Sequence, residues 1–302
     1  MATKIAICQL SSCWGCQESL LDLYEKLVPI LPSLDIKYWC TVIDMKKQGL
    51  KEIPNAGIDL SFVEGMCRTE DDVELLKLAR EKSKLLVAYG TCSSYGGIPG
   101  LANMFARDEL LRRKFIEAES IAEGTIPTVN LPEITPRVVK NDQIVKMDLI
   151  LTGCPPTTNN VAKVVEALLQ GQTPTLETKS VCDECKREKE EKIQIKEFKR
   201  NFVGKADPKK CLLSQGYLCM GPGTKAGCEA QCPSANTPCS GCHGPADGVL
   251  DHGAKLMSAI SSVVDMPPEK LSESIKDVVG TFYKFTLPSA LIPLSLESVK
   301  RR

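Results

Sequence analysis

The sequence predicts an α/β protein in which a doubly wound parallel sheet is followed by an irregular, cysteine-rich module and a short helical C-terminal tail. Three observations predict this fold class. Up to about residue 170, short apolar runs alternate with segments of helical periodicity. After Gly171 the composition changes abruptly, and eight of the fifteen cysteines crowd into residues 182–242. No cysteine follows residue 242.

The first 170 residues carry the pattern of alternating strands and helices. Five short runs are β-branched or continuously apolar, as buried strands are, and lie at residues 4–10, 36–43, 58–64, 84–89 and 148–152. Four segments between or after them repeat apolar residues at helical spacing, at residues 18–31, 70–81, 103–119 and 159–169. Strands that alternate with helices build a parallel sheet covered on both faces. We therefore expect a flavodoxin-like sheet with strand order 2-1-3-4-5.

The length of 302 residues is enough for about two domains. The stretch Gly171-Gln172-Thr173-Pro174 predicts a boundary between a sheet domain, residues 1–172, and a second domain, residues 173–302. Because residues 182–242 contain few apolar runs, we expect something other than a conventional core to hold this segment together. Beyond it, the pattern predicts helices at residues 248–264 and 268–276, and then an apolar tail interrupted by prolines.

Charge and hydropathy exclude several classes of function. The 38 basic residues balance 38 acidic ones, which removes the positive excess typical of proteins that bind nucleic acids or anionic membranes. The N-terminus shows no signal-peptide pattern, and the apolar stretch at residues 278–296 is broken by Lys284, Pro288 and Pro293. We expect a cytoplasmic protein with no nucleic-acid or membrane partner. In that reducing compartment, fifteen cysteines indicate metal binding or redox work rather than disulfides.

Four cysteines follow predicted strands of the first domain. Cys13 and Cys16 form a C-x-x-C pair after the first strand, Cys92 follows the fourth, and Cys154 follows the fifth. Because the carboxyl ends of parallel strands meet at one crevice, these thiols are expected to form one four-ligand site. Four thiolates suit tetrahedral zinc or an iron-sulfur cluster, and the spacing leaves both open. A thioredoxin-like redox pair does not account for the two additional cysteines.

Neighbouring residues refine this site. Three glycines beside the ligands permit tight turns and close backbone approach to a cluster: Gly15, Gly90 and Gly153. Cys67 also follows a predicted strand and competes for a ligand position. Cys8 and Cys40 fall inside predicted strands, where we expect free cysteines to be small buried apolar residues.

Eight further cysteines have the spacing C-x2-C-x25-C-x7-C-x8-C-x3-C-x6-C-x2-C. They suffice for two four-cysteine sites, and the simplest partition gives the first four to one site and the last four to the other. Interleaved partitions remain open. The compact cysteine run of bacterial ferredoxins is absent, so a ferredoxin insertion is disfavoured, whereas two zinc ribbons in a non-redox interaction module remain an alternative.

Several motifs together resemble the small subunit of nickel-iron hydrogenases. They occur in the family's order and are Cys13-Trp14-Gly15-Cys16-Gln17-Glu18, Val63-Glu64-Gly65, Gly90-Thr91-Cys92, Gly153-Cys154-Pro155-Pro156 and Pro238-Cys239-Ser240-Gly241-Cys242. The resemblance implies an electron-transfer subunit and disfavours zinc. It also implies a large-subunit partner that carries the nickel site, because nothing after Cys242 in this chain supplies the second cysteine pair that this site needs.

The resemblance assigns the twelve cysteines to three clusters. The ligand sets it implies are proximal Cys13, Cys16, Cys92 and Cys154; distal Cys182, Cys185, Cys211 and Cys219; and medial Cys228, Cys232, Cys239 and Cys242. Two positions depart from the respiratory members of the family. Those members have a histidine where Cys182 stands, and Cys232 adds a fourth ligand to a medial site that has three in those members. The implied cofactors are three 4Fe-4S clusters.

Within the family, three stretches look most like the methanogen viologen-reducing, deazaflavin-independent type: VEGMCRTEDD, GTCSSYGGIPGLANMF and CLLSQGYLCMGPGTKAGC. In that type a small iron-sulfur subunit passes electrons to heterodisulfide reductase. These two proteins are therefore the further partners that the resemblance implies. A small subunit of a deazaflavin-reducing hydrogenase is the alternative within the family.

Two acidic residues and two histidines complete the candidate residues. The resemblance implies a place for Glu18 near the subunit interface, with a role in proton exit from the nickel site, and a similar role for Glu64 at a strand end facing the proximal cluster. Glu18 also has a simpler interpretation, a carboxylate stabilised by the helix dipole at the start of a helix. His243 and His252 both follow the last cysteine, and we expect each to make an ordinary polar contact rather than a metal bond.

Overall fold

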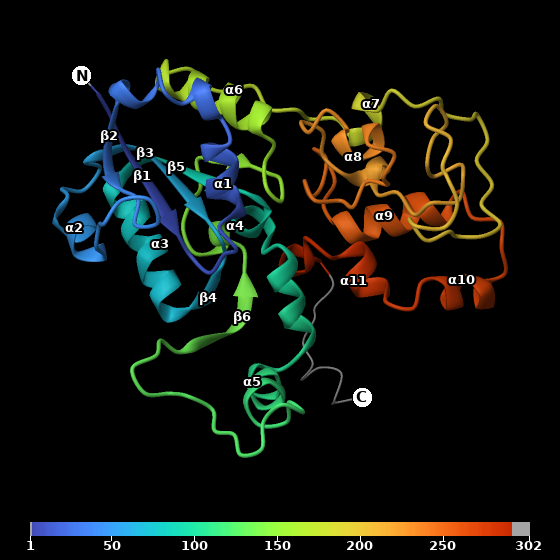
Figure 1. Cartoon of the computed structure of the whole chain (residues 1–302), viewed down its shortest axis with the longest axis horizontal. Helices are drawn as coiled ribbons and strands as arrows, with labels where there is room; N and C mark the ends of the chain where they lie inside the picture. Colours follow the sequence, from blue (N-terminus) through green and yellow to red (C-terminus); the bar gives the residue numbers. More distant parts are fainter. Residues whose placement is uncertain (1, 292–302) are drawn as a thin grey trace.

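A five-stranded parallel sheet forms the first region of the computed structural model, which describes residues 2–291 (Figure 1). Its strands are β1 (Thr3–Gln9), β2 (Leu34–Tyr38), β3 (Ile58–Glu64), β5 (Ser83–Tyr89) and β7 (Leu149–Leu151). Their order in the sheet is β2-β1-β3-β5-β7. Counted along the chain, this is the order 2-1-3-4-5, so the predicted doubly wound, flavodoxin-like arrangement is confirmed.

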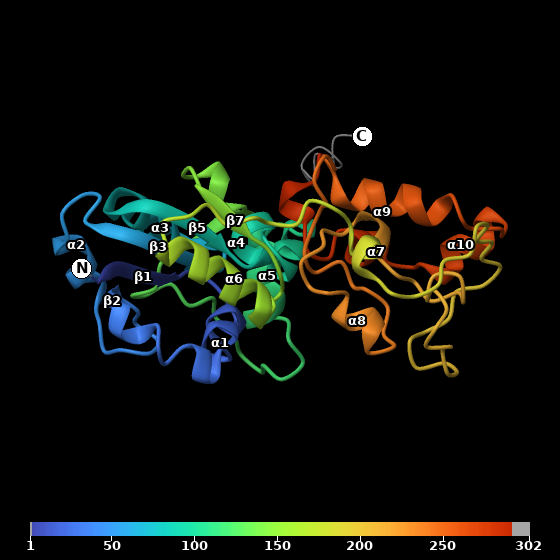
Figure 2. The same ribbon diagram turned by 90° about the horizontal axis from the view of Figure 1, so that it is seen from above.

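Helices cover both faces of this sheet, as Figure 2 shows. Helices α1 (Gly15–Leu21) and α6 (Thr158–Leu169) pack on one face through Leu20, Val161 and Val165. Helices α2 (Lys47–Glu52) and α3 (Glu70–Lys82) pack on the other face through residues such as Leu50 and Leu76. The residue that precedes α3, Thr69, forms a reciprocal capping box with Asp72, which fixes where the helix begins.

Several predicted elements are shorter than expected. The helix expected at 18–31 ends at Leu21, because the chain turns into 3-10 geometry and Tyr24 adopts a left-handed φ of 46°. The strand expected at 36–43 ends at Tyr38, and residues 40–43 form a turn. The helix expected at 103–119 is a 3-10 segment, Ile98–Met104, followed by α5 (Arg107–Phe115). A small antiparallel ribbon of β4 (Cys67–Thr69) and β6 (Ile134–Val139) was not predicted; β4 has only three residues, and Pro136 interrupts the pattern of β6.

The second region is mostly irregular. Its helices are α7 (Val181–Glu184), α8 (Gln231–Ser234), α9 (His252–Ser261), α10 (Pro268–Ser274) and α11 (Val278–Phe282). The buried side chain of Arg187 connects the loops of this region, because it donates hydrogen bonds to the backbone carbonyls of Asp207, Lys210 and Pro233. Helices α9 and α10 agree with the helices predicted at residues 248–264 and 268–276, whereas α11 lies in the stretch predicted as an apolar tail interrupted by prolines. The predicted tail extends into residues 292–302, which lie outside the described residues.

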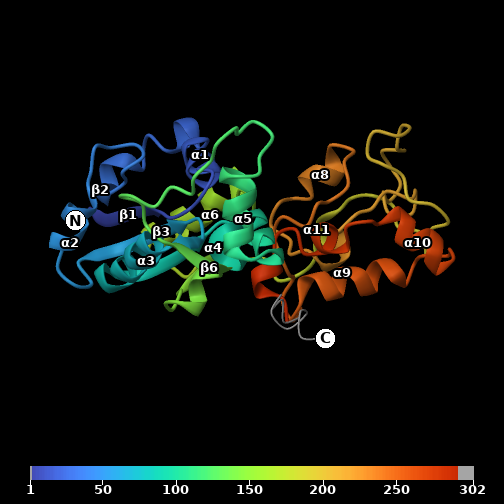
Figure 3. The same ribbon diagram turned by 90° about the horizontal axis from the view of Figure 1, so that it is seen from below.

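The two regions lie side by side, with α11 and the end of the described chain between them (Figure 3). Pro288 packs against the positions of Gly96 and Gly100 in the first region, and the Tyr95 ring packs against Gly244 in the second. No helix in residues 2–291 is both long and apolar enough to cross a membrane. The domain boundary between residues 172 and 173 stays a prediction.

Candidate metal centres

Four cysteines meet at the carboxyl edge of the sheet. Cys13 and Cys16 lie in the turn into α1 and in its first turn, Cys92 lies in the first turn of α4 (Thr91–Tyr95), and Cys154 follows β7. Electrostatic interactions with Cys13, Cys92 and Cys154 all act on the Cys16 thiol. The fold thus gathers the four residues that were expected to share one crevice.

Burial and mutual proximity dominate the electrostatics of this group. Burial raises the pKa of the Cys92 thiol to about 12 and also raises the pKa values of Cys16 and Cys154. Interactions with the neighbouring cysteines raise all three pKa values further. Without a cation the thiols are therefore protonated, whereas a bound metal ion deprotonates its ligands and offsets their mutual repulsion. Four soft donors of this kind fit iron or zinc.

Two glycines make room for the sulfur atoms. A Cβ atom at Gly90, where φ is +85°, would lie 2.2 Å from Cys16 Sγ. At Gly97, where φ is +60°, it would lie 2.4 Å from Cys92 Sγ. Of the three glycines singled out in the sequence, Gly90 and Gly153 adopt positive φ, whereas Gly15 does not. Gly97 was not identified from the sequence.

The three remaining cysteines of the first region occupy different environments. Cys67 is fully buried in the core beneath α3, and burial raises the pKa of its thiol to about 12. It does not appear among the charges that act on Cys16, Cys92 or Cys154. Cys8 is buried in β1 as expected. The expectation for Cys40 is wrong, because the strand ends before it and the residue is exposed in a turn.

The two acidic candidates differ in burial. Glu64 is 1 % exposed, and its Oε1 accepts hydrogen bonds from Gln17 Nε2 and, at 3.1 Å, from Ser12 Oγ. Burial raises the pKa of Glu64, although these donors oppose the rise. Gln17 Oε1 in turn accepts from Trp39 Nε1 at 2.6 Å. Glu18 is exposed in the first turn of α1.

A cavity of about 290 Å³ opens between the two regions and is lined by the last four cysteines, Cys228, Cys232, Cys239 and Cys242. Cys239 is buried, Cys232 is exposed, and Cys228 and Cys242 are half-buried. Backbone amides of Ala230 and Gly241 donate to the sulfur atoms of Cys228 and Cys239, which lowers the pKa of each thiol against the larger effect of burial.

A separate, smaller cavity is lined by the preceding four cysteines, Cys182, Cys185, Cys211 and Cys219. Burial raises the pKa of the Cys182 thiol to about 12, and Cys219, Cys211 and Cys185 raise it further. A Cβ atom at Gly221 would lie 3.1 Å from Cys182 Sγ. The two cavities therefore divide the eight cysteines in the order in which they occur along the chain.

Backbone groups connect the three sets of cysteines. Cys154, from the edge of the sheet, lines the 290 Å³ cavity, and its backbone amide donates to the Cys242 thiol, whose pKa this contact lowers. The Cys239 amide donates to Cys219 Sγ at 3.3 Å. Thr91 Oγ1 accepts from the Gly153 amide at 3.0 Å and donates to the Cys242 carbonyl at 2.5 Å. The last four cysteines thus lie between the set at the sheet edge and the preceding four. The sequence spacing does not predict this order.

The arrangement of the sulfur atoms bears on the kind of metal group. A zinc site draws four ligands to about 2.0–2.3 Å from one point. Among residues 2–291, no three Cys, His, Asp or Glu side chains are placed to hold a single metal ion. The cysteines of the second region instead surround cavities. The cavity of the last four cysteines has a volume of about 290 Å³ and that of the preceding four about 30 Å³.

The two histidines differ from each other. His252 has the polar contacts expected of it, with Thr224 Oγ1 at 3.3 Å and Thr286 Oγ1 at 3.5 Å. His243 is 1 % exposed and lines the same cavity as Cys242, yet its Nδ1 has no hydrogen-bond partner among the described residues. Burial lowers the pKa of each imidazole to about 4. The place of His243 beside this cavity was not evident from the sequence.

Comparison with known proteins agrees with this geometry. The family described as NADH ubiquinone oxidoreductase, 20 Kd subunit, matches residues 13–168, just over half of the chain. A subunit of the vhu F420-non-reducing hydrogenase of Methanocaldococcus jannaschii is 43% identical over 292 residues and covers 97% of both chains. A subunit of the F420-non-reducing hydrogenase of Methanothermobacter marburgensis is 39% identical over 306 residues, with 97% of both chains covered. The iron-sulfur subunit of such a hydrogenase from Archaeoglobus profundus is 37% identical over 315 residues, covering 97% of this chain and 98% of its own.

Solved structures give the same result. A chain of an NAD+-reducing NiFe hydrogenase in the H2-reduced state superposes with a TM-score of 0.54 at 26% identity, covering 58% of this chain and 95% of its own. A chain of the Dm. baculatum NiFeSe hydrogenase has a TM-score of 0.51 at 19% identity, covers 81% of this chain and 95% of its own, and supports the fold. The chain therefore belongs to the family of hydrogenase small subunits, together with these subunits of F420-non-reducing hydrogenases.

Proposed function

We propose that this chain relays electrons from hydrogen oxidation, carried out by a nickel-iron large subunit, through three 4Fe-4S clusters. The observation that carries the proposal is the serial arrangement of the three cysteine sets, joined through Cys154, Cys242, Cys239 and Cys219. The proposed ligands are Cys13, Cys16, Cys92 and Cys154 (proximal), Cys228, Cys232, Cys239 and Cys242 (medial), and Cys182, Cys185, Cys211 and Cys219 (distal). When bound, such clusters supply reversible one-electron acceptors.

The chain's own residues would hold and tune this relay. Amides that donate to ligand sulfurs stabilise negative charge there, and such hydrogen bonds are one means by which a protein adjusts the reduction potential of a cluster. The amides of Ala230 and Gly241 are placed to act on the medial set, and those of Gly221 and Cys239 on Cys219 of the distal set. Burial of the second region would exclude water from the same sites.

The large subunit would cover the carboxyl edge of the sheet. Cys13 and Trp14 are exposed there, the indole side chain being 51% exposed. A permanent interface between subunits buries about 2,000 Å² or more. Glu18 on the surface and Glu64 beneath it are proposed to take part in proton movement at this interface, with Gln17 and Ser12 holding the Glu64 carboxyl in place.

The finer assignment concerns the electron acceptor. We infer that a small iron-sulfur subunit accepts electrons from this chain and passes them to heterodisulfide reductase. Relatives that match nearly the full length are named for not reducing F420, which is a deazaflavin. These names favour the proposed acceptor over the deazaflavin-reducing alternative.

Metal analysis of the anaerobically purified complex tests the proposal. A brown protein with about twelve irons in this chain is expected for three four-iron clusters. A colourless protein with two or three zinc ions would instead establish the zinc-stapled alternative. Light scattering on the chain expressed alone provides a second test, because a stable, iron-replete monomer with no affinity for the large subunit would contradict the hydrogenase role.

A further inference from the structure

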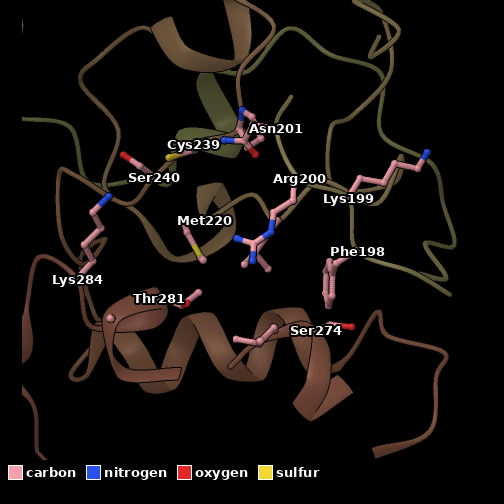
Figure 4. Close-up of a pocket in the computed structure, with 14 residues that line it drawn as sticks. Phe198, Lys199, Arg200, Asn201, Met220, Cys239, Ser240, Ser274, Thr281 and Lys284 are labelled. Carbon is pink, nitrogen blue, oxygen red and sulfur yellow. The ribbon is translucent and has the colours of Figure 1, made fainter. Parts of the chain in front are cut away.

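A further cavity lies in the second region beside the 290 Å³ cavity, with which it shares the lining residues Cys239 and Ser240. It has a volume of about 360 Å³, within the range of small-molecule sites. Its walls are residues 198–201, a short stretch around Met220, the Pro238–Ser240 turn, and the chain from Ser274 to Lys284. Segments that are far apart in the sequence therefore build it, as Figure 4 shows.

The charged side chains of this cavity are all positive. Lys199, Arg200 and Lys284 line it, and no Asp or Glu side chain does so. None of the three forms an ion pair with any described residue, whereas 14 ion pairs join other residues between 2 and 291. Asp277, the acid three residues before the lining residue Gly280, accepts from the Gly280 amide at 2.8 Å. In a chain of zero formal net charge, this concentration of unpaired cations is local.

Figure 4 shows how these groups are directed. The Arg200 guanidinium lies in the middle of the cavity, and the Lys284 ammonium approaches from the side that Ser240 occupies. Lys199 points away from the centre, and its ammonium lies 5.9 Å from the centre of the Tyr217 ring. The Lys284 ammonium lies 5.4 Å from the centre of the Phe285 ring and also acts on the Cys154 thiol. Arg200 is thus the central cation of the cavity, and Lys284 is a second cation at its edge, beside Ser240.

Uncharged hydrogen-bonding groups complete the lining. Ser240, Ser274 and Thr281 contribute hydroxyl groups, and Asn201 contributes an amide. Phe198, Met220 and other apolar residues form the remaining surface. Ser274 Oγ donates to the Lys270 carbonyl at 2.8 Å, and the Ser240 hydroxyl donates to the Cys242 thiol, so Thr281 and Asn201 are the remaining uncharged donors. A planar guanidinium, an ammonium and these two donors, without a carboxylate, match the many acceptor oxygens of a phosphate better than the two of a carboxylate.

We propose that this cavity is a binding site for a phosphate-bearing small molecule, with Arg200 as its principal ligand and Lys284 as the second charge. This proposal rests only on the lining of the cavity and does not depend on the proposed electron relay. Arg200 binds the phosphate by two parallel N–H bonds, and the Thr281 hydroxyl and the Asn201 amide donate to the remaining oxygens. A diphosphate group fits the two positive charges better than a monoanion does.

Isothermal titration calorimetry of the intact, anaerobically purified complex with inorganic pyrophosphate tests this site. Arg200→Gln should weaken binding about tenfold or more, the loss expected for a two-pronged hydrogen bond to a charged group. Lys284→Gln should weaken it by a smaller factor. Lys205→Gln is the matched control, because Lys205 is exposed in the same loop and does not line the cavity. Iron content is measured for every variant to establish that the module is intact.

A measurement on the unmodified protein stands beside the variants. Pyrophosphate should protect amides of residues 198–201 and 274–284 from hydrogen exchange. Tighter binding of ADP than of pyrophosphate would identify a nucleotide as the source of the phosphate, and equal binding would identify the phosphate group alone; both support the site. No binding of pyrophosphate, unchanged affinity in Arg200→Gln, equal loss in Lys205→Gln, or protection outside these segments would each overturn the proposal.

Discussion

The two regions of this chain position their cysteines by different means. In the first region, strands and helices with conventional apolar cores on both sheet faces set the positions of the loops that carry Cys13, Cys92 and Cys154. In the second, the cysteines are part of the core. Cys219 and Cys239 are buried in it with Leu256 and Ile260, and Cys185, Cys211 and Cys228 pack against it.

This difference indicates what each region needs in order to fold. The sheet region buries enough apolar surface to form without a bound group, so a cluster would be added to an existing crevice. Residues 182–242 contain only short helical turns, and five cysteines whose ionised forms repel one another share their core with apolar side chains. We infer that a metal group contributes directly to the folding of the second region, as structural metals do in small domains.

The largest expected effect follows from removing the metal. Chelation of iron under reducing conditions should increase hydrogen exchange across residues 182–242 by about 100-fold or more, because the cysteines then lose the metal group that links them. The amides of β1, β3 and β5 should stay protected. Mass spectrometry of exchanged peptides measures both regions in one sample. Equal loss in the two regions, or no loss in either, would contradict the comparison.

The next effect concerns the first region alone. Cys92→Ser should lower the iron content from about twelve to about eight per chain, while the fold of the sheet and the second region persist. Hydrogen-dependent reduction of an added dye should collapse even though nickel remains in the partner. Iron analysis and dye assays measure these two results.

Cys67→Ser provides the matched control for this change, because Cys67 is a buried cysteine of the same region that packs against the core beneath α3. It should keep all the iron. If Cys92→Ser retained full iron while Cys67→Ser lost four, Cys67 would be the true ligand.

How much the sequence predicts also differs between the regions. Apolar runs and helical periodicity are local signals, so the strand order and the gathering of Cys13, Cys16, Cys92 and Cys154 could be predicted. The early ends of α1 and β2 could not be predicted, because the 3-10 turn at Tyr24 and the exposed turn at Cys40 override the local signals.

In the second region, spacing predicted two four-cysteine sites and their simplest partition, while interleaved partitions stayed open. The contacts of Cys154 with Cys242 and of Cys239 with Cys219 depend on how distant segments pack, as does the position of His243. None of these has a local signal. A pattern of residues therefore predicted the chemistry of the donors better than their order in space.

A milder effect is expected from Cys232, the exposed member of the medial set. Cys232→Ser leaves Cys228, Cys239 and Cys242, which suffice for a three-iron cluster. Electron paramagnetic resonance of the oxidised variant should therefore show a three-iron signal, with about one iron lost per chain. An unchanged spectrum and iron count would show that Cys232 is not a ligand.

The smallest expected effect is a dependence on pH that is confined to the second region. Both histidines of the chain lie there, and burial lowers the pKa of each from 6.5 to about 4. Between pH 6.5 and 4 the unfolded chain binds a proton that the folded chain does not, so stability falls as the pH falls. At pH 5.5 the loss is about 1.4 kcal/mol for each imidazole, or about a tenfold increase in the opening of this region.

Hydrogen exchange at pH 7.5 and 5.5, corrected for intrinsic rates, measures this dependence in α9 and in β3 of the same protein. His252→Gln should remove about half of the response in α9, because the Gln amide does not titrate and still contacts Thr224 and Thr286, while His243 continues to titrate. Strand β3 should not show this loss of stability, since the first region contains no histidine, and the raised pKa of Glu64 makes its contribution to stability increase as the pH falls. An equal response in β3, or an undiminished response in the His252→Gln variant, would show that the pH dependence comes from groups other than these imidazoles.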